Sequence, residues 1–548
     1  MAKQRTRKSD IRLARVRDAL QQGRPQEAMA LARQILAVRK RDAAALNLAG
    51  IAAFQCGDPV EARALLEDAR DRAPKDAEIC MNLANVIAAS GDVDAALLSY
   101  EAAYDLAPGY AEPAYNAGVL LSKHGRHSEA AEWFRNAMTR DPEHPAAAIG
   151  CAEALRAAGN LSAAKTELEA RIALQPKDPV AYTNLAAVLS GMGDDAAARD
   201  AGERAVEIDP GLAAAHFNIG VAQQSLSDHK AALERYRRTL ALEPAHAAAA
   251  LNLGEAYAAL DDTEEARRAY RRALEIDPGF AKAAINLADM KLATGEPEAA
   301  LAVIDGFLLR HTSHPAALAF KAFALRDAGR DGDAALLDDA DRFILQRRLE
   351  PPDGFADIDG FNQAMAMHLL DHPTLTPSPT AHATRKGRHS GELLSPPLGP
   401  MGAFRDQVEA GFKAYKRKFA GEPAHPYLDA CPADIEISIW GVVMDEDGHQ
   451  VPHIHPSAWL SGVYYVEVPD SVKSDDPSRA GWIEFGRPPE DIHTQHDSHV
   501  TLFRPEPGLM LLFPSHFYHR TVPLTGSARR ISIAFDIVPA GRREHTTV

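Results

Sequence analysis

Three histidines and an arginine in the C-terminal third of this 548-residue chain have the types and spacing of a metal site with an anion-binding group beside it. His453 and His455 are two residues apart, so on a β-strand both side chains point to the same face. His519 follows a second apolar run, and imidazole nitrogens are ligands for iron. Arg530 and Ser532 share one face of the next apolar run, and a guanidinium can hold a carboxylate with two parallel hydrogen bonds. These residues predict a metal centre with an anionic cosubstrate.

Short β-prone runs separated by turn residues must hold these side chains. The predicted strands are Ile435–Met444, Leu460–Val468, Trp482–Phe485, Val500–Phe503, Leu509–Phe513 and Arg530–Val538. Many short strands with turns between them indicate a small barrel-like β domain. Helical spacing over Ala403–Phe419 predicts a helix that packs on it. His493, His496 and His499 lie in a polar loop and are predicted to be solvated or part of a lid.

Three segments, PHIHPSAWLSGVYYVEVP, GLMLLFPSHFYHRTVP and RRISIAF, occur in this order and resemble the 2-oxoglutarate/Fe(II) oxygenases, a prolyl-hydroxylase-like group. The resemblance covers the last third of the chain and implies a double-stranded β-helix, or jelly-roll, fold. It implies His453 and His519 as iron ligands, and Arg530 with Ser532 on the far carboxylate of 2-oxoglutarate. No catalytic residue beyond the metal ligands is expected.

His455 stands where this group usually has a carboxylate ligand. It can be the third iron ligand, a residue that orients the ligands, or a substrate-side residue while water completes the site. Three imidazoles can hold one face of an iron ion and leave three positions open, two for 2-oxoglutarate and one for oxygen. We therefore predict metal ligation by His453, His455 and His519.

A 34-residue period runs through the first two-thirds of the chain. Three residue types recur at this spacing: Gly23, Gly57, Gly91, Gly125, Gly159, Gly193, Gly295 and Gly329; Ala28, Ala62, Ala96, Ala130, Ala164, Ala198, Ala232, Ala266, Ala300 and Ala334; and Pro74, Pro108, Pro142, Pro176, Pro210, Pro244 and Pro278. The glycine can end a helix, the alanine lets paired helices approach closely, and the proline stops the second helix. Ser227 and Asp261 interrupt the glycine series. The pattern resembles the tetratricopeptide repeat and implies about ten helix pairs, with degenerate units at both ends.

A row of asparagines keeps the same 34-residue register. It comprises Asn82, Asn116, Asn184, Asn218, Asn252 and Asn286, with Gly150 breaking the series once and Asn47 one residue out of phase. The resemblance places this position on the concave face, and similar arrays related to O-GlcNAc transferase carry an asparagine ladder. An amide can donate to and accept from a peptide backbone at once, so the row could bind an extended peptide. The alternative is that the asparagine caps or packs within the repeat.

Composition excludes several classes of protein. The net charge of −16, from 60 basic and 76 acidic residues, argues against nucleic acid as a main partner. No apolar run approaches the ~18 residues of a membrane span. Cys56, Cys80, Cys151 and Cys431 form no C-x-x-C motif, which fits thiols in a reducing cytoplasm. A cytoplasmic protein without nucleic-acid or membrane partners is predicted.

Together these features predict a multidomain chain, with an all-α tetratricopeptide superhelix over residues 1–348 and a double-stranded β-helix domain with flanking helices over residues 349–548. The predicted function is a dioxygenase dependent on Fe(II) and 2-oxoglutarate, which hydroxylates a peptide or protein side chain bound in the concave face of the array. The alternative is a protein-interaction scaffold with a catalytically degenerate oxygenase domain, which the missing carboxylate favours.

Overall fold

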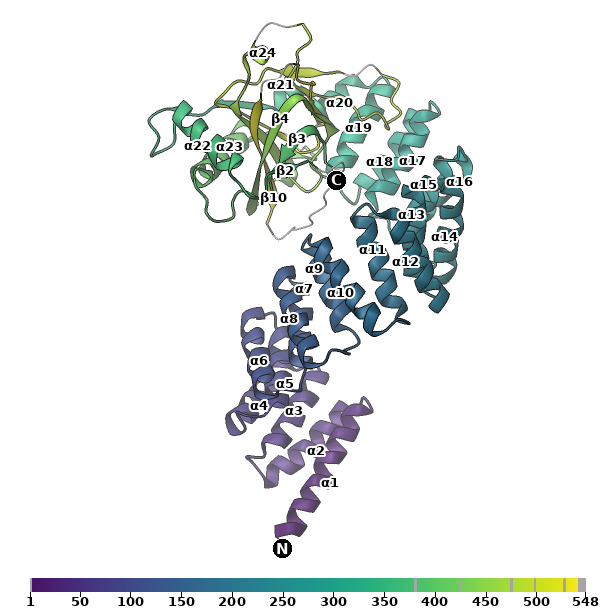
Figure 1. The fold of residues 1–548 in the computed structure, drawn as a ribbon, viewed down its shortest axis with the longest axis vertical. Helices are drawn as coiled ribbons and strands as arrows, with labels where there is room; N and C mark the ends of the chain where they lie inside the picture. The colour runs from purple at the N-terminus through teal and green to yellow at the C-terminus, as the bar shows by residue number, and fades with distance from the viewer. Residues whose placement is uncertain are drawn as a thin grey trace. The chain divides into compact units, whose positions relative to one another are not determined.

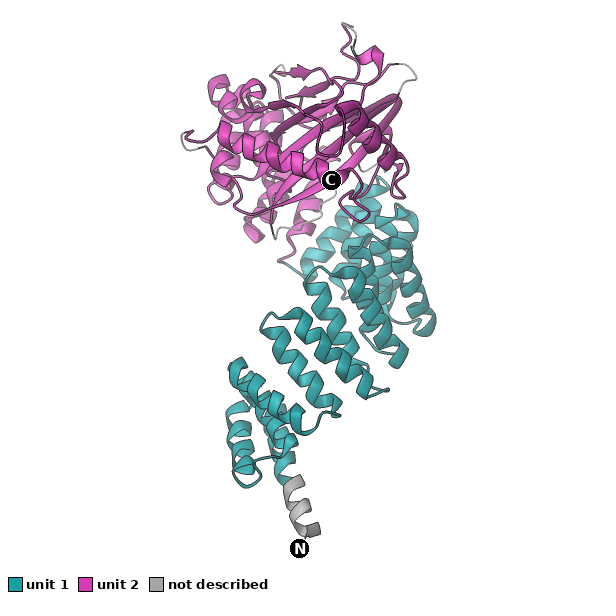
Figure 2. Ribbon diagram, turned by 90° about the vertical axis from the view of Figure 1, so that its left-hand side faces the viewer, with its two compact units in different colours: residues 1–244 teal, residues 245–548 magenta. Residues whose placement is uncertain are grey.

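The structure divides into two compact units, Met1–Pro244 and Ala245–Val548, which Figure 2 shows in teal and magenta. It is a computed structural model that describes residues 2–378, 382–422, 425–473, 477–496, 499–525 and 529–540, with side chains from residue 11 onward except that of Lys473. The predicted boundary between residues 348 and 349 stays a prediction.

The 34-residue repeat is a helix pair, as predicted, and ten such pairs follow one another in the described chain (Figure 1). The first unit contains α1 (Ala2–Gln21), α2 (Pro25–Val38), α3 (Ala43–Gln55), α4 (Pro59–Arg72), α5 (Ala77–Ala89), α6 (Val93–Leu106), α7 (Glu112–Lys123), α8 (His127–Arg140), α9 (Ala147–Ala157), α10 (Leu161–Leu174), α11 (Pro179–Gly191), α12 (Asp195–Ile208), α13 (Ala213–Ser225) and α14 (His229–Leu242). The second unit begins with α15 (Ala247–Ala258), α16 (Thr263–Ile276), α17 (Ala281–Ala293), α18 (Pro297–Leu308), α19 (Pro315–Asp327) and α20 (Asp331–Asp338).

Each turn inside a helix pair contains one residue in the left-handed conformation. The eight glycines of the repeat have φ angles from 67° to 87°. Ser227 and Asp261, which interrupt the glycine series in sequence, keep the same geometry with φ angles of 62° and 60°. An L-residue is strained in this conformation because its Cβ approaches a carbonyl oxygen. The backbone geometry of the repeat is therefore kept along the chain even where its glycine is not.

Replacing Ser227 by glycine should stabilise the protein by about 1 kcal/mol. The left-handed conformation costs an L-residue about 1–2 kcal/mol, and part of the gain is offset because glycine has more freedom in the unfolded chain. Urea unfolding followed by circular dichroism measures the change. Gly193→Ser at the equivalent position is the matched control and should lose a similar amount. An unchanged midpoint in both variants would contradict this account.

The rest of the second unit is an antiparallel sheet with flanking helices, as predicted. Its strands are β1 (Leu345–Arg348), β2 (Thr376–Pro377), β3 (Thr384–His389), β4 (Ile435–His453), β5 (Leu460–Glu467), β6 (Ile483–Phe485), β7 (Thr501–Phe503), β8 (Leu509–Pro514), β9 (His519–Thr521) and β10 (Arg530–Pro539). Its helices are α21 (Ala340–Phe343), α22 (Ile358–Leu370), α23 (Met401–Lys418), η1 (Leu428–Ala430) and α24 (Asp470–Lys473). The strand order is β1-β8-β5-β10-β4-β9-β6-β7, with β3 also on β4 and β2 on β3.

Strand β4 connects the two parts of this sheet. Its first half pairs with β10, from Ile435 opposite Pro539 to Met444 opposite Arg530. Its last residues pair with the short strand β9, where His453 lies opposite His519. The strand continues through Asp447, which has a φ angle of 57°, so the register shifts there without ending the strand. The predicted strand Ile435–Met444 is thus longer than expected and delivers His453 to a second set of partners.

One hydrophobic core joins the last helix pairs to the sheet. Buried side chains from α17 through α20 belong to the same cluster as those of β5, β8 and β10. Two buried histidines of the sheet domain add polar contacts across this junction: His425 Nε2 lies 2.6 Å from the carbonyl oxygen of Leu336, and His516 Nε2 lies 2.9 Å from that of Leu337. The last repeats and the sheet domain are therefore parts of one packed body.

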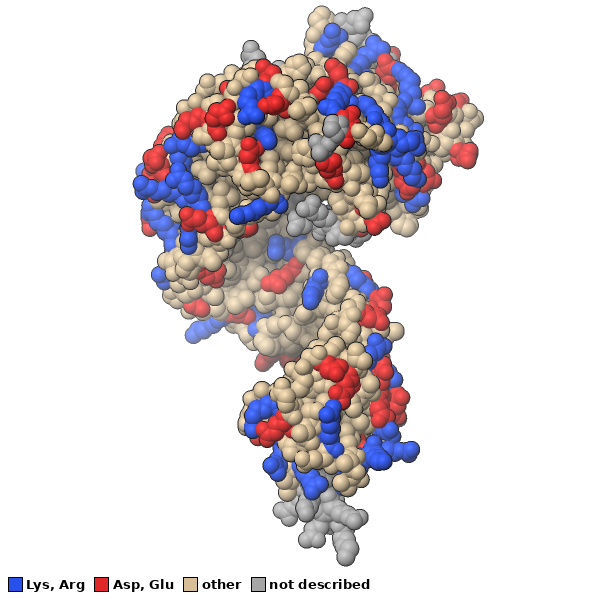
Figure 3. All heavy atoms as spheres, turned by 180° about the vertical axis from the view of Figure 1, so that it is seen from behind, with Lys and Arg blue, Asp and Glu red and all other residues tan. Residues whose placement is uncertain are grey.

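Three general features of the chain bear on function. No described helix is long and apolar enough to cross a membrane. The four cysteines are free, with Cys80 and Cys151 buried. On the face shown in Figure 3, lysine and arginine side chains are interspersed with aspartate and glutamate, so the net negative charge does not gather into one acidic region of that face.

Candidate metal centre

The three predicted metal ligands come together in the structure. His453 and His519 are opposite each other on β4 and β9, and their ring centroids are 4.2 Å apart. The ring centroid of His455, just beyond the end of β4, lies 5.3 Å from that of His453 and 5.2 Å from that of His519. One nitrogen from each ring can be chosen so that all three lie within 4.8 Å of one another. This spacing suits three ligands on one face of a metal ion.

Hydrogen bonds fix the orientation of all three rings. His453 Nδ1 lies 2.8 Å from the carbonyl oxygen of Val451, and His519 Nδ1 lies 3.0 Å from that of Phe517. His455 Nδ1 lies 2.8 Å from Asp536 Oδ1. Carbonyl and carboxylate oxygens only accept, so each Nδ1 carries the proton and donates. The lone pair is then on Nε2 of each ring, and the Nε2 of His455 is buried without a hydrogen-bond partner.

Burial keeps two of the imidazoles neutral. Removal from water, followed by the charge of neighbouring His455, lowers the pKa of His453 to about 3. Burial likewise lowers the pKa of His519 well below its usual value, because a second charge beside the His453 and His455 rings is unfavourable. A neutral imidazole is the form that binds a metal. Both rings are therefore in the binding form at neutral pH.

Asp536 is a site residue that sequence reasoning missed. Its carboxylate accepts from His455 Nδ1 and, at 2.6 Å, from the hydroxyl of Ser461. A carboxylate behind a histidine ligand holds the ring in place and raises its basicity. The His-x-His pair lacks the usual carboxylate ligand, and the carboxylate of Asp536 lies behind His455 instead.

Replacing Asp536 by asparagine should lower Fe(II) affinity about tenfold, because residues that orient histidine ligands typically contribute a factor of about 10–100 in metal affinity. Anaerobic competition against a chelator of known affinity measures the change. Asp445→Asn is the matched control, since the Asp445 side chain is 56% exposed and its nearest cation, on Arg388, is 3.8 Å away. Equal affinities in the two variants would show that Asp536 does not act on the centre.

Arg530 is a buried cation that contacts the strand carrying His519. Its side chain is 2% exposed, Nη1 donates to the carbonyl oxygen of Gly481 at 2.6 Å, and Nη2 donates to Thr521 Oγ1 at 3.2 Å. Thr521 is two residues after His519 on β9, so the guanidinium reaches the strand that carries a predicted ligand. Nε has no partner, and no ion pair among the described residues includes Arg530. Burial lowers the pKa of Arg530, and the nearby hydroxyl of Tyr465 offsets part of this effect.

The surroundings of Arg530 fit an anion. Ser532, predicted to share its task, is 3% exposed and pairs with Tyr465 of β5. The centre of the guanidinium is 5.5 Å from the ring of Tyr465, whose buried hydroxyl has no hydrogen-bond partner. Burial raises the pKa of Tyr465 to about 12, so the hydroxyl keeps its proton and can donate. Tyr465 was not predicted as a site residue, although strand alternation from the SGVYY segment could have indicated it.

The six predicted asparagines are all half-buried, and several bond to neighbouring helices. In the first unit, Asn82 Nδ2 donates to Asn47 Oδ1 at 2.9 Å, Asn116 Nδ2 to Asn85 Oδ1 at 3.4 Å, and Asn218 Nδ2 to the Thr183 carbonyl at 2.9 Å. Asn184 Nδ2 instead donates within its own helix, to the Val180 carbonyl at 3.1 Å. In the second unit, Asn286 Nδ2 donates to Glu255 Oε1 at 3.3 Å, and Asn252 also has a partner. Some of the amide groups of this row are therefore engaged in hydrogen bonds between neighbouring repeats.

Comparison with known proteins follows the same division of the chain. Residues 438–536 match the family described as "Putative 2OG-Fe(II) oxygenase". Tetratricopeptide repeat families match residues 19–85, 121–189 and 261–323, and residues 81–147 and 217–279. The protein carries tetratricopeptide repeats and a C-terminal domain of this oxygenase family. The oxygenase-family match includes both His453 and His519 as well as Arg530.

Solved structures resemble the repeats only loosely. The APC/C hetero-tetramer Cut9-Hcn1 is 18% identical over 52% of this chain and 55% of that chain, with a TM-score of 0.35. A thermophilic tetratricopeptide protein of Thermus thermophilus is 23% identical over 33% of this chain and 100% of its own, with a TM-score of 0.30. MamA of Desulfovibrio magneticus is 25% identical over 31% and 96%, with a TM-score of 0.28. No curated protein matches the chain.

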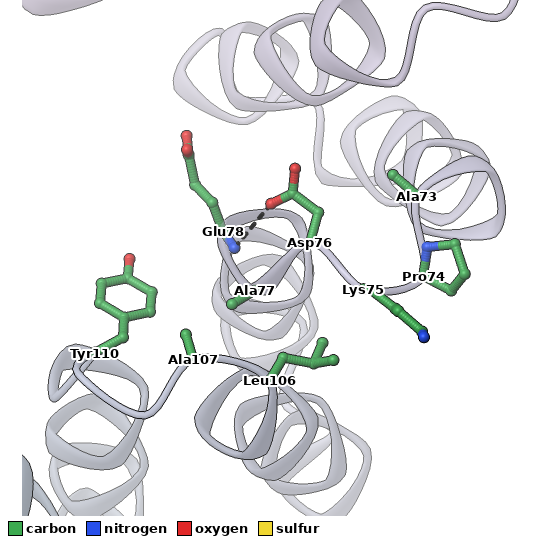
Figure 4. A pocket seen from close by; sticks show the side chains of 9 residues that line it. All are labelled: Ala73, Pro74, Lys75, Asp76, Ala77, Glu78, Leu106, Ala107 and Tyr110. Atoms are coloured by element: carbon green, nitrogen blue, oxygen red, sulfur yellow. Dashed lines mark hydrogen bonds between the residues drawn. The ribbon is translucent and has the colours of Figure 1, made fainter.

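A pocket in the first unit carries no comparable chemistry. It lies between the turn before α5 and the turn between α6 and α7, and Figure 4 shows the side chains that line it. The carboxylate of Asp76 is engaged there as the cap of α5, accepting from the backbone N–H of Glu78 at 3.1 Å. None of the predicted site residues lines this pocket.

Proposed function

We propose that the chain is a dioxygenase dependent on Fe(II) and 2-oxoglutarate, which hydroxylates a peptide or protein side chain recruited by the repeats. The observation that carries the proposal is the buried guanidinium of Arg530. A buried cation without a carboxylate partner is costly unless an anion joins it. The guanidinium also donates to Thr521 on β9, the strand that carries His519, so a metal on the three imidazoles and a dianionic cosubstrate would both find partners in this part of the sheet.

The residues divide the work between metal and cosubstrate. His453, His455 and His519 would hold Fe(II) through their Nε2 atoms, and Asp536 would keep His455 oriented. Arg530, assisted by the hydroxyls of Tyr465 and Ser532, would hold the far carboxylate of 2-oxoglutarate. With iron bound, the centre would convert 2-oxoglutarate, O2 and a C–H bond into succinate, CO2 and a C–OH group. The buried β5, β8 and β10 strands exclude water around these groups.

The asparagine row would bind the peptide. An amide that donates Nδ2–H to a neighbouring helix still has a second N–H and an acceptor oxygen for a backbone group. Half-buried amides at a constant spacing suit an extended chain without reading its side chains. A cytoplasmic location remains part of this proposal.

Succinate release tests the proposed function. Purified protein with Fe(II), 2-oxoglutarate and O2 should form succinate slowly without substrate, and faster with a hydroxylatable peptide. The control contains Zn(II) in place of Fe(II), which binds imidazoles but has no redox chemistry. Iron binding without any succinate above the zinc control would instead support the alternative, a scaffold with a degenerate oxygenase domain.

A further inference from the structure

A segment of the sheet domain is bound by the last two repeats as if it were a peptide. The segment follows β6, and its residues His493 to His496 lie against α17 and α19, all within the second unit. The backbone N–H of His493 donates to Asp289 Oδ1 at 2.8 Å. The backbone N–H groups of Gln495 and His496 donate to the carboxylate of Asp327, at 3.1 Å and 2.9 Å. The two carboxylates thus accept hydrogen bonds from three main-chain N–H groups.

Two side chains of the segment also donate hydrogen bonds to these carboxylates. The hydroxyl of Thr494 donates to Asp327 Oδ1 at 2.7 Å, and His493 Nδ1 donates to Asp289 Oδ2 at 2.7 Å. The side chain of His493 nevertheless stays 63% exposed, whereas that of Asp289 is only 15% exposed. The segment is therefore held by hydrogen bonds from its backbone and polar atoms, with little burial of its own side chains. The histidines of this polar loop are exposed, in line with the prediction that they are solvated, and residues 493–496 are in addition bonded to the array.

The two carboxylates belong to the helices that carry the repeat pattern. Asp289 is one helical turn after Asn286 on α17, so both side chains lie on the same face of that helix. Asp327 is the last residue of α19, which is the first helix of the next pair. Phe323, one turn earlier on α19, packs against Tyr518 with ring centroids 5.5 Å apart. The same face of the array thus contacts both the segment and the residue before His519.

We propose that Asp289 and Asp327 form a binding site for a short peptide in a turn-like conformation, and that residues 493–496 occupy it as an internal ligand. The ligand class follows from the contacts. It must offer three backbone N–H groups, so proline is excluded at the positions of His493, Gln495 and His496. It gains from an imidazole followed directly by a hydroxyl residue, as in His493 and Thr494. An external peptide of this type would compete with the chain's own segment.

This competition would reach the candidate metal centre, a consequence that rests on the proposed function. Gly486, where the segment leaves β6, donates its N–H to the carbonyl oxygen of Tyr518. The preceding residue, Phe485, pairs with His519 on β9, and the two ring centroids are 5.8 Å apart. Displacing the segment would loosen the strand that packs against a metal ligand. Peptide binding to the repeats would then change the packing of β6 against His519.

A labelled peptide EDIHTQH, corresponding to residues 490–496, tests the site in the full-length protein without iron or 2-oxoglutarate. The wild-type protein should bind it weakly, because a tethered segment competes at roughly millimolar effective concentration. The double variant Thr494→Ala/His496→Pro removes one hydroxyl and one backbone donor from the internal segment. It should bind the peptide at least about tenfold more tightly, since each hydrogen bond to a charged group contributes about that factor. Fluorescence anisotropy measures both affinities.

A second comparison shows whether the carboxylates make the site. Adding Asp327→Asn to the double variant should abolish the gain, whereas adding Asp331→Asn should not, because the Asp331 side chain is 67% exposed and its carboxylate lies 3.6 Å from the His496 ring. Melting curves confirm that each variant is folded. Equal peptide affinity in wild type and double variant, or binding that survives Asp327→Asn, would overturn the proposal. Because no cofactor is present, either outcome leaves the succinate test independent.

Discussion

Replacing His519 by alanine should abolish Fe(II) binding at neutral pH. The variant loses one of the three Nε2 lone pairs and leaves two imidazoles, which hold a metal ion more than about 100-fold less tightly than three, since even groups behind the ligands contribute about 10–100-fold. Anaerobic titration with Fe(II) against a competing chelator measures the affinity. His449→Ala is the matched control, because the Nδ1 of His449 bonds to the backbone carbonyl of Asp447, outside the cluster. Retention of tight binding would exclude His519 as a ligand.

His455→Ala separates the three-histidine site from its alternatives. If His455 is a ligand, the affinity should fall as it does in His519→Ala. If water completes the site instead, the affinity should be unchanged, and only succinate formation should be altered. The buried and unpartnered Nε2 of His455 supports the first result. Wild-type affinity in His455→Ala would contradict the three-histidine centre while leaving His453 and His519 as a pair.

Replacing Arg530 by lysine should weaken 2-oxoglutarate binding about 10- to 100-fold. An ammonium keeps the charge but loses the planar fork, and a hydrogen bond to a charged group contributes about 1.5–3 kcal/mol. Calorimetry on the Zn(II)-loaded protein measures binding without turnover. Arg529→Lys is the control, because that side chain is 39% exposed and pairs with Glu467 at 2.8 Å. A larger loss in Arg529→Lys would mean that the anion lies on the opposite face of β10.

Periodicity made the repeats predictable, since a residue every 34 positions identifies a helix pair without any knowledge of its neighbours. The spacing of two predicted that His453 and His455 lie close together, although β4 ends at His453 and His455 follows it. Their role as metal ligands stays a prediction. The left-handed turns at Ser227 and Asp261 show that the position within the 34-residue repeat, rather than the residue type, determines the backbone conformation there. Local patterns are sufficient where the structure itself repeats.

Residues that depend on strand register could not be predicted in this way. Asp536 is 81 positions from His455, and only the pairing of β10 with its neighbours brings the two together. The contacts of His493 with Asp289 span 204 positions. Helices α18 and α20 carry the repeat alanines Ala300 and Ala334 like the earlier pairs, so the repeat pattern by itself does not indicate that they share a core with the sheet. Contacts between residues so far apart in the sequence produce no periodic pattern from which they could be predicted.

The shared core of the last repeats and the sheet has a thermodynamic consequence. In a solenoid, stability is close to a sum of repeats and their interfaces, so the end unit usually frays first. Here the last helix pairs share a core with the sheet, so we expect them to unfold together with it. A metal ion bound to the folded sheet stabilises it by mass action, by about 2.7 kcal/mol at one hundred times the dissociation constant. Because α17 to α20 share this core, metal binding would also stabilise them against unfolding, although they do not contact the ion.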